Sequence, residues 1–261
     1  MKRLFRGFLL VCLAAVGVAS AQEAPPPCPC PEPPPPPDPI WFGKADFSFL
    51  STSGNTDTTS IGAGFDLNYR PKPWLFTLKG AYLKGATDGV TTAESFTGSV
   101  RATRDLTEHI DVFLGGSYLR NRFSGIDNLY GFDGGAGYKF LLGPVHFLRV
   151  EGGVGYTHEE DIITADDVTF TTSRNYANAK AGLQYKWQFT KNAAFTNEFS
   201  YLVDLDDTAN WFIGDKAAIT AAISKVFALQ ASWTLLYRNQ PVIGFGHTDT
   251  ATAVGLVAKF P

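Results

Sequence analysis

The fold of this chain is decided by the stretch TSIGAGFDLNY at residues 59–69, in which apolar and polar side chains alternate without an error. One face of this stretch carries the apolar side chains of Ile61, Ala63, Phe65, Leu67 and Tyr69. The other face is polar or small, with Ser60, Gly62, Gly64, Asp66 and Asn68. A period of two is the signature of a β-strand with one apolar and one polar side. The pattern recurs about twelve times in runs of roughly ten residues, which is typical of a transmembrane β-barrel.

We therefore predict an all-β fold, a transmembrane up-and-down antiparallel β-barrel of about twelve strands in residues 41–261. The expected strands are 41–52, 59–69, 74–84, 94–104, 110–120, 129–140, 146–157, 176–189, 194–204, 211–223, 227–238 and 249–260. Two residues break the outward apolar face, Asn197 in the ninth strand and Asp215 in the tenth. Short connectors alternate with longer ones, and the longest loop is expected at about 158–174. Because such barrels have short periplasmic turns and longer outer loops, both termini are predicted to be periplasmic.

Aromatic residues of the lipid-facing parity collect at both ends of the expected strands. The outer girdle would contain Tyr82, Tyr118, Tyr130, Tyr156, Tyr201, Trp211 and Tyr237. The inner girdle would contain Trp41, Tyr69, Trp74, Phe140, Trp187, Phe195, Phe227 and Phe260. Amphipathic rings at the headgroup level explain two such bands. A soluble β-sandwich, whose strands also alternate, has no reason to arrange its aromatic residues in this way.

Residues 1–21 are predicted to be a signal peptide. Lys2, Arg3 and Arg6 are followed by an apolar stretch at 8–18 and a small-x-small cleavage site at 19–21. That apolar stretch is too short to span a bilayer as a helix. Removal of this leader deletes three basic and no acidic residues, which changes the formal net charge from -3 to -6.

Residues 22–40 form a second segment that is rich in proline and is predicted to be a periplasmic tether. Proline cannot join a strand ladder or a helix interior, so the segment should run as extended polyproline. Cys28 and Cys30 are the cysteines that remain after processing, in an oxidising compartment. A disulfide between two residues so close would be strained. The segment is therefore either a stiff spacer or a site of cross-linking to another copy or another protein.

The predicted location is the outer membrane of a Gram-negative envelope. Expected partners are outer-membrane lipids, lipopolysaccharide and the barrel assembly machinery, which reads an alternating C-terminal strand that ends in an aromatic residue. Residues 254–260 fit that signal, although Pro261 follows the aromatic Phe260. We expect a monomer without a cofactor. The acidic processed chain excludes a generally basic nucleic-acid binder.

Five short motifs, each containing glycine, are spread along the expected barrel. They are Ser53-Gly54-Asn55-Thr56, Arg120-Asn121-Arg122-Phe123-Ser124-Gly125-Ile126, Gly134-Gly135-Ala136-Gly137-Tyr138, Glu151-Gly152-Gly153-Val154-Gly155-Tyr156 and the run from Pro241 to Asp249. Through these motifs the chain resembles the domain-of-unknown-function 481 family, often described as salt-induced outer-membrane proteins. The resemblance covers nearly all of residues 41–260 and implies a barrel in the outer membrane. It brings no established substrate or catalytic residue.

Catalysis is not expected. Twelve-stranded outer-membrane phospholipases need a Ser–His pair at the outer membrane boundary, with a third group that orients the imidazole. His109 and His146 map to the periplasmic end of the expected strands. His158 and His247 lie at outer loop edges without a serine at matching depth. Interfacial or loop hydrogen bonding is their expected role.

The expected outer loops are acidic. Glu159, Glu160, Asp161, Asp166 and Asp167 cluster in the longest loop. Carboxylate oxygens at this density are candidate ligands for calcium or magnesium, but their spacing matches no dedicated calcium loop. A solvated acidic loop, bridged to lipopolysaccharide by divalent ions, is the alternative, and no dedicated metal site is predicted.

Charged residues of the inward parity are the candidate functional residues, because they would line the lumen. They are Lys44, Asp46, Asp66, Lys79, Arg101, Asp111, Asp133, Lys139, Arg149, Glu151, Lys180, Lys186, Glu198 and Arg238, with Lys259 near the last strand end. The interior of a twelve-stranded barrel is intermediate in width. Eight-stranded barrels have an interior that side chains can fill, and sixteen-stranded barrels enclose an open channel. A modest basic excess would favour anions if a path exists, whereas opposite charges on neighbouring strands can pair and fill the interior.

Two functions therefore stay open. The first is a narrow passive channel for small solutes, with a preference for anions. The second is a closed structural or interaction barrel that contacts the cell envelope through its tether and its acidic outer loops. Three arginines distinguish the two functions. A continuous water-filled track along Arg101, Arg149 and Arg238 would favour transport, whereas pairing of each arginine to a carboxylate across the barrel would count against transport.

Overall fold

A computed structural model describes residues 39–52, 58–121, 124–165 and 168–260. The predicted signal peptide and nearly all of the tether, with Cys28 and Cys30, lie outside the described residues. The strands are β1 (Trp41–Thr52), β2 (Thr58–Tyr69), β3 (Trp74–Thr87), β4 (Val90–Asp105), β5 (Ile110–Asn121), β6 (Ile126–Leu142), β7 (His146–Ala165), β8 (Val168–Trp187), β9 (Ala193–Asp204), β10 (Trp211–Ala222), β11 (Phe227–Arg238) and β12 (Thr248–Phe260).

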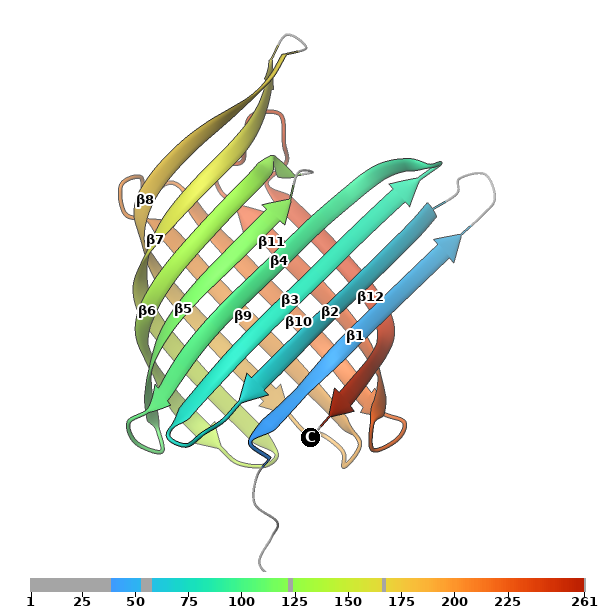
Figure 1. The fold of residues 1–261 in the computed structure, drawn as a ribbon, viewed down its shortest axis with the longest axis vertical. Coiled ribbons are helices and arrows are strands. Elements are labelled where there is room, and N and C mark those ends of the chain that lie inside the picture. The colour runs from blue at the N-terminus through green and yellow to red at the C-terminus, as the bar shows by residue number, and fades with distance from the viewer. Residues whose placement is uncertain (1–38, 53–57, 122–123, 166–167, 261) are drawn as a thin grey trace, which may run out of the picture. The chain divides into compact units, whose positions relative to one another are not determined.

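These strands form one closed antiparallel barrel in which each strand pairs with its neighbours in sequence. β1 pairs with β12 and closes the cylinder (Figure 1). The predicted up-and-down barrel of twelve strands is confirmed. None of the residues described forms a helix that is long and apolar enough to cross a membrane.

The alternating sequence explains why the sheet closes with its apolar side outward. β1 and β2 pair in register from Trp41↔Tyr69 to Thr52↔Thr58, so side chains of equal parity share a face. Phe47 and Phe65 on the outward face are 55% and 41% exposed. A water-soluble protein rarely exposes large apolar side chains over so wide an area. The barrel is therefore built with an apolar exterior and a polar interior.

Aromatic rings stack along both ends of the outward surface. Trp41 stacks on Tyr69 with ring centroids 4.4 Å apart. At the other end Trp211 lies between Tyr201 and Tyr237, at 6.1 and 5.0 Å. The rings thus form lateral rows across neighbouring strands, as the two predicted girdles require.

The two ends of the barrel differ in their connections. Short turns at 70–73, 106–109, 143–145, 188–192 and 223–226 join the strands at the end where β1 begins and β12 finishes, and we call this the short-turn end. At the opposite, far end the connections are 53–57, 88–89, 122–125, 166–167, 205–210 and 239–247. Of the far-end connections, only 205–210 and 239–247 are longer than every short turn.

The expected long loop at 158–174 is wrong, because β7 and β8 continue through it as paired strands as far as Ala165↔Val168. This hairpin rises beyond the other strands at the top of Figure 1. Residues 162–172 are dominated by β-branched and aromatic side chains, which favour strands. Strands that extend beyond the lipid do not need an apolar outward face. The alternation of apolar and polar residues is therefore weaker in this part of the sequence, although β7 and β8 remain paired.

The seam between β1 and β12 has a shorter ladder than the other strand pairs. It runs from Gly43↔Phe260 to Ser48↔Gly255. β1 itself continues to Thr52, and β12 begins at Thr248. Within the described residues, the two strands are therefore paired with each other only in the half nearer the short-turn end.

Candidate functional site in the barrel lumen

The polar interior contains three adjoining cavities of about 790, 370 and 380 Å³. Ser117 of β5 and Leu236 of β11 border all three. The first cavity reaches Arg70 at the short-turn end, and the third reaches His247 at the far end. Space thus continues along the lumen from one end to the segment that covers the other.

All but two of the charged residues predicted to line the lumen border these cavities. They are Lys44, Asp46, Asp66, Lys79, Arg101, Asp111, Asp133, Lys139, Arg149, Glu151, Lys180, Glu198 and Arg238. Lys186 and Lys259 border none of the three.

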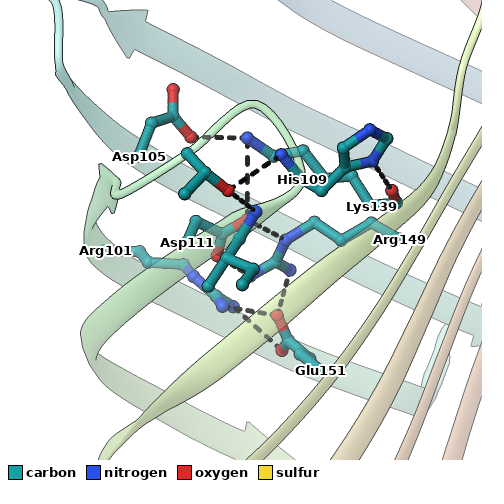
Figure 2. A network of polar contacts seen from close by, with 9 residues as sticks. Arg101, Asp105, His109, Asp111, Lys139, Arg149 and Glu151 are labelled. Carbon is teal, nitrogen blue, oxygen red and sulfur yellow. Dashed lines mark hydrogen bonds and ion pairs between the residues drawn. The ribbon is translucent and has the colours of Figure 1, made fainter.

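Four of these residues, on β4, β5 and β7, join in a buried ion-pair network (Figure 2). Arg149 binds Asp111 in a bidentate manner, with Nε 2.9 Å from Oδ2 and Nη2 2.6 Å from Oδ1. It also donates to Glu151, which accepts from Arg101 Nη1 at 3.0 Å and Nη2 at 2.5 Å. The side chains of Asp111 and Arg149 are 0% and 6% exposed. Such a buried pair is sensitive to the loss of either partner.

Lys139 extends this inner network toward the turn between β4 and β5. Its Nζ lies 2.5 Å from Asp105 and 3.8 Å from Asp111. The Nδ1 of His109 lies 2.7 Å from the carbonyl oxygen of Lys139, which fixes the turn beside it (Figure 2). The half-exposed Asp105 is the solvent-facing edge of the network.

Glycines make room for the inner network. A Cβ added at Gly182 would lie 2.9 Å from Cγ of Glu151, and one added at Gly135 would lie 2.9 Å from the Phe113 ring. The guanidinium of Arg101 lies 3.7 Å from the centroid of that buried ring. A Cβ at Gly135, in one of the glycine-containing motifs, would also meet the backbone of β7 at Gly152 and Gly153, so a larger side chain there would disturb both the strand pairing and the Phe113 ring.

A charge pair spans the lumen between opposite walls. Nζ of Lys79, on β3, lies 3.2 Å from both carboxylate oxygens of Glu198, on β9. Nζ of Lys79 is also 3.8 Å from Asp66. β3 and β9 are six strands apart in the closed order, so this contact narrows the lumen. Lys180 and Asp133 form a further pair at 2.6 Å along the wall.

A second charged cluster lies toward the far end, around the fully buried Glu159 of β7. Its Oε2 accepts from Nη2 of Arg174 at 2.8 Å and from the hydroxyl of Tyr176 at 3.1 Å. Nη1 of Arg238, on β11, lies 2.6 Å from Oε1 of Glu159 and 3.5 Å from Asp161. Two cations are therefore bound to two carboxylates, and the cluster connects β7, β8 and β11.

The connection 239–247 reaches across the far end of the barrel. Val242 is 6% exposed, and a Cβ built on Gly125 would lie 2.7 Å from Cβ of Val242 and 2.8 Å from the Phe245 ring. Nδ2 of Asn121 lies 3.4 Å from Oδ2 of Asp249. These contacts join the β5–β6 corner to the β11–β12 corner on the opposite wall. Two of the sequence motifs thus meet across the mouth of the lumen.

The acidic residues expected to form one outer loop do not act as a group. Glu159 and Asp161 point into the lumen, whereas Glu160 points outward and accepts from Asn128 Nδ2 at 2.6 Å. Asp166 and Asp167 lie outside the described residues. Across the described ranges, no three His, Cys, Asp or Glu side chains are grouped so that they could hold a metal ion.

Each histidine has a local hydrogen-bond partner. His146 contacts the Tyr185 hydroxyl at 3.0 Å, and His158 contacts the Asn175 side chain at 2.6 Å. His247 contacts the carbonyl oxygen of Arg238 at 3.0 Å. These contacts tie the imidazoles to strand ends, as the sequence predicted.

Several lumen residues were missed by the sequence reasoning. They are Phe113, Glu159, Asp161, Arg174, Lys216 and Asp249. Glu159 and Asp161 have the same parity in β7 as the inward residues Arg149 and Glu151. The sequence therefore contained a signal for their inward orientation, provided that the strand was extended beyond Tyr156. Lys216 was obscured because its neighbour Asp215 breaks the apolar face of the same strand.

The chain is similar to proteins of uncharacterised function. The family model described as "Protein of unknown function, DUF481" matches residues 45–260. The "Uncharacterized protein YdiY" of Escherichia coli (strain K12) is 27% identical over 215 residues, which cover 82% of this chain and 81% of the relative.

Solved barrel structures are also similar in fold. The NanC porin has a TM-score of 0.48 and 9% identity, with 83% of this chain and 100% of that chain covered. An outer membrane channel from Pseudomonas putida F1 has a TM-score of 0.49 and 11% identity, with 86% and 97% covered. Because the family model spans most of the sequence and nearly the whole barrel, the chain belongs to the DUF481 family of proteins of unknown function.

Proposed function

We propose that the protein is a narrow passive channel of the outer membrane for small polar solutes. The observation that carries the proposal is the run of three adjoining cavities from Arg70 to His247, which leaves the lumen hollow rather than filled. The barrel wall is closed by strand pairing, so a solute would pass along its axis.

The exterior supports the membrane location. Large apolar side chains are exposed between two rows of stacked aromatic rings, as in barrels that cross an outer membrane. The short-turn end would face the periplasm, with both ends of the barrel chain on that side. Membrane lipids and lipopolysaccharide would then contact the outward face.

The charges of the lumen support weak ion selectivity. Arg101, Arg149 and Arg238 are each bound to at least one carboxylate. This pairing counts against a continuous anion track, because each guanidinium charge is compensated within about one hydrogen-bond length. We therefore propose small polar solutes of either charge, or none, rather than anions.

A closed interaction barrel is the second candidate, and the contacts across the lumen favour it. The Lys79–Glu198 pair and the Asn121–Asp249 contact join opposite walls. If these contacts persist in the membrane, they block passage at two levels.

Planar-bilayer recording separates the two functions. We would compare the wild-type protein with a variant in which residues 240–246 are replaced by Asn-Gly, a two-residue turn that cannot reach the opposite wall. The channel predicts conductance steps in the wild type, larger steps in the variant and little ion selectivity. If both proteins are folded, as shown by heat-modifiable migration, and both are silent, the channel proposal is wrong.

A further inference from the structure

The seam between β1 and β12 leaves part of the barrel wall without strand pairing. Its ladder ends at Ser48↔Gly255, although β1 continues to Thr52 and β12 begins at Thr248. On their other sides the two strands stay paired, β1 with β2 and β12 with β11. Within the described residues, 49–52 of β1 and 248–254 of β12 therefore have no partner across the seam.

This unpaired stretch lies at the depth of the lipid. Thr248 pairs with Tyr237, which belongs to the row of stacked rings at the far end, so residues 249–254 lie on the membrane side of that row. The outward side chains of Phe49 and Val254 beside it are 57% and 65% exposed. Backbone groups without a partner are costly in hydrocarbon and are tolerated where they border a cavity. The stretch is therefore a place where the interior of the barrel meets the membrane.

The inward side chains behind the unpaired stretch are small. On β12 they are Ala251 and Ala253, followed by Gly255. Their partners on β11 are Thr234 and Ser232. No large side chain of these two strands separates the seam from the axis of the barrel.

The cavities of the lumen reach both strands of the seam. The second cavity borders Asp46 of β1, and the third borders Asp249 of β12. A molecule in the third cavity is therefore beside the strand that lacks a partner.

The third cavity is the apolar part of an otherwise polar lumen. The first cavity borders the charged inner network, whereas five inward apolar side chains from β5, β6, β9, β10 and β11 border the third. These five are Leu119, Leu129, Leu202, Phe212 and Leu236. Leu236 is 36% exposed although it points into the lumen. Apolar walls of this kind bind the apolar part of a small molecule.

The size and the polar groups of the third cavity define the class of ligand. Its volume of about 380 Å³ suits one short chain and is too small for a phospholipid with two chains. The cations that border it, Arg101, Lys180 and Arg238, are already bound to carboxylates. The hydroxyls of Ser117, Ser124 and Ser200 also border it and can bind an uncharged polar head.

We infer that a single-chain amphiphile with an uncharged polar head passes between the third cavity and the surrounding lipid through the unpaired half of the β1–β12 seam. The chain lies against the apolar side chains of the cavity and leaves sideways past the small residues of β12. This route is lateral, so it is separate from the axial path proposed for polar solutes. It rests on the proposed membrane location and not on conduction along the axis.

Paired cysteines test the geometry of the seam. In a background without the two tether cysteines, Phe47→Cys with Leu256→Cys, the ladder-site variant, replaces outward residues that are paired across the seam. Phe49→Cys with Val254→Cys, the gap-site variant, replaces the next outward residue of each strand. We expect mild oxidation to join the cysteines of the ladder-site variant and to leave those of the gap-site variant free. Equally fast disulfide formation in both would show that the ladder continues, which would overturn the inference.

Photolabelling tests the route itself. The probe is dodecanol that carries a photoreactive diazirine, added to lipid vesicles that contain the folded barrel, and mass spectrometry locates the labelled residues. In the wild type we expect label on Leu202 and Leu236 inside the barrel, besides label on outward residues. A bismaleimide bridge in the gap-site variant should abolish the inward label and keep the outward label. The same bridge in the ladder-site variant is the matched control and should keep both.

Two results of the labelling would overturn the inference, namely a wild type without inward label and a bridged gap-site variant that keeps it. Heat-modifiable migration of both bridged proteins shows that the barrel is folded, so loss of label cannot be ascribed to misfolding. The bridge should leave conductance along the axis unchanged. Inward label that depends on the seam in a barrel without conductance would overturn only the channel.

Discussion

At the scale of single residues, burial separates two carboxylates of the inner network that both bind cations. Asp111 is 0% exposed and accepts two hydrogen bonds from Arg149, whereas Asp105 is 52% exposed and contacts Lys139. Removing one member of a buried pair leaves the other charge uncompensated. An exposed pair is screened by water and contributes little.

We therefore expect Asp111→Ala to lower the free energy of unfolding by about 3 kcal/mol, and Asp105→Ala to lower it by less than about 1 kcal/mol. Urea unfolding of the barrel in lipid vesicles would measure both values. Asp105→Ala is the matched control, since it also removes one carboxylate from the same network. Equal losses would show that burial of Arg149 does not control the stability of this region.

At the scale of elements, the connection 239–247 is held over the far end by its contacts with Gly125. Gly125 has a φ of 81°, and Gly89, in the β3–β4 turn, has a φ of 79°. An added Cβ is strained at both positions. At Gly125 it would also collide with Val242 and Phe245, whereas nothing lies within 4 Å of a Cβ added at Gly89.

Gly125→Ala should consequently displace the connection and raise single-channel conductance, and Gly89→Ala should leave conductance unchanged. Both variants should lose about 1 kcal/mol of stability to backbone strain, so stability cannot explain a difference in conductance. Planar-bilayer recording would check the result. Identical conductance in the two variants would mean that the connection does not limit passage.

At the scale of the whole molecule, the strand pairing of the described residues lies within residues 41–260. A mature chain that begins at residue 39 lacks residues 22–38 of the predicted tether but keeps every strand of the described barrel. We expect it to fold into the same heat-modifiable barrel with unchanged conductance, because no strand loses a neighbour. Gel migration and bilayer recording would measure this. Failure of the shortened chain to fold would show that residues 22–38 contribute to the barrel itself.

The strand count could be predicted from the sequence because the signal is local. Each strand must present an apolar side to the exterior, so residues such as Phe47 and Phe65 repeat at a period of two within a single strand. The same signal fails where no lipid contact is required, which is why 158–174 was expected to be a loop although β7 and β8 pair through it.

The ion pairs of the lumen could not be predicted in the same way. Parity places Lys79 and Glu198 inside, but 119 positions separate them, and their contact depends on the diameter and register of the closed sheet. The meeting of Asn121 with Asp249 likewise depends on how one connection folds across the mouth. Local alternation carries no information on such distances.

The half-paired seam between β1 and β12 has a consequence for the order in which the cylinder opens and closes. β1 and β12 hold each other only from Gly43↔Phe260 to Ser48↔Gly255, which is a shorter ladder than that of any other neighbouring strands described. Under force or in denaturant, the strands of the barrel should therefore begin to separate at the far end of this seam. The ladder bonds of this seam must also wait until β12, the barrel strand that lies farthest from β1 in the sequence, has formed. Until then the unfinished sheet has two free edges, and free edges can pair with a strand of another protein.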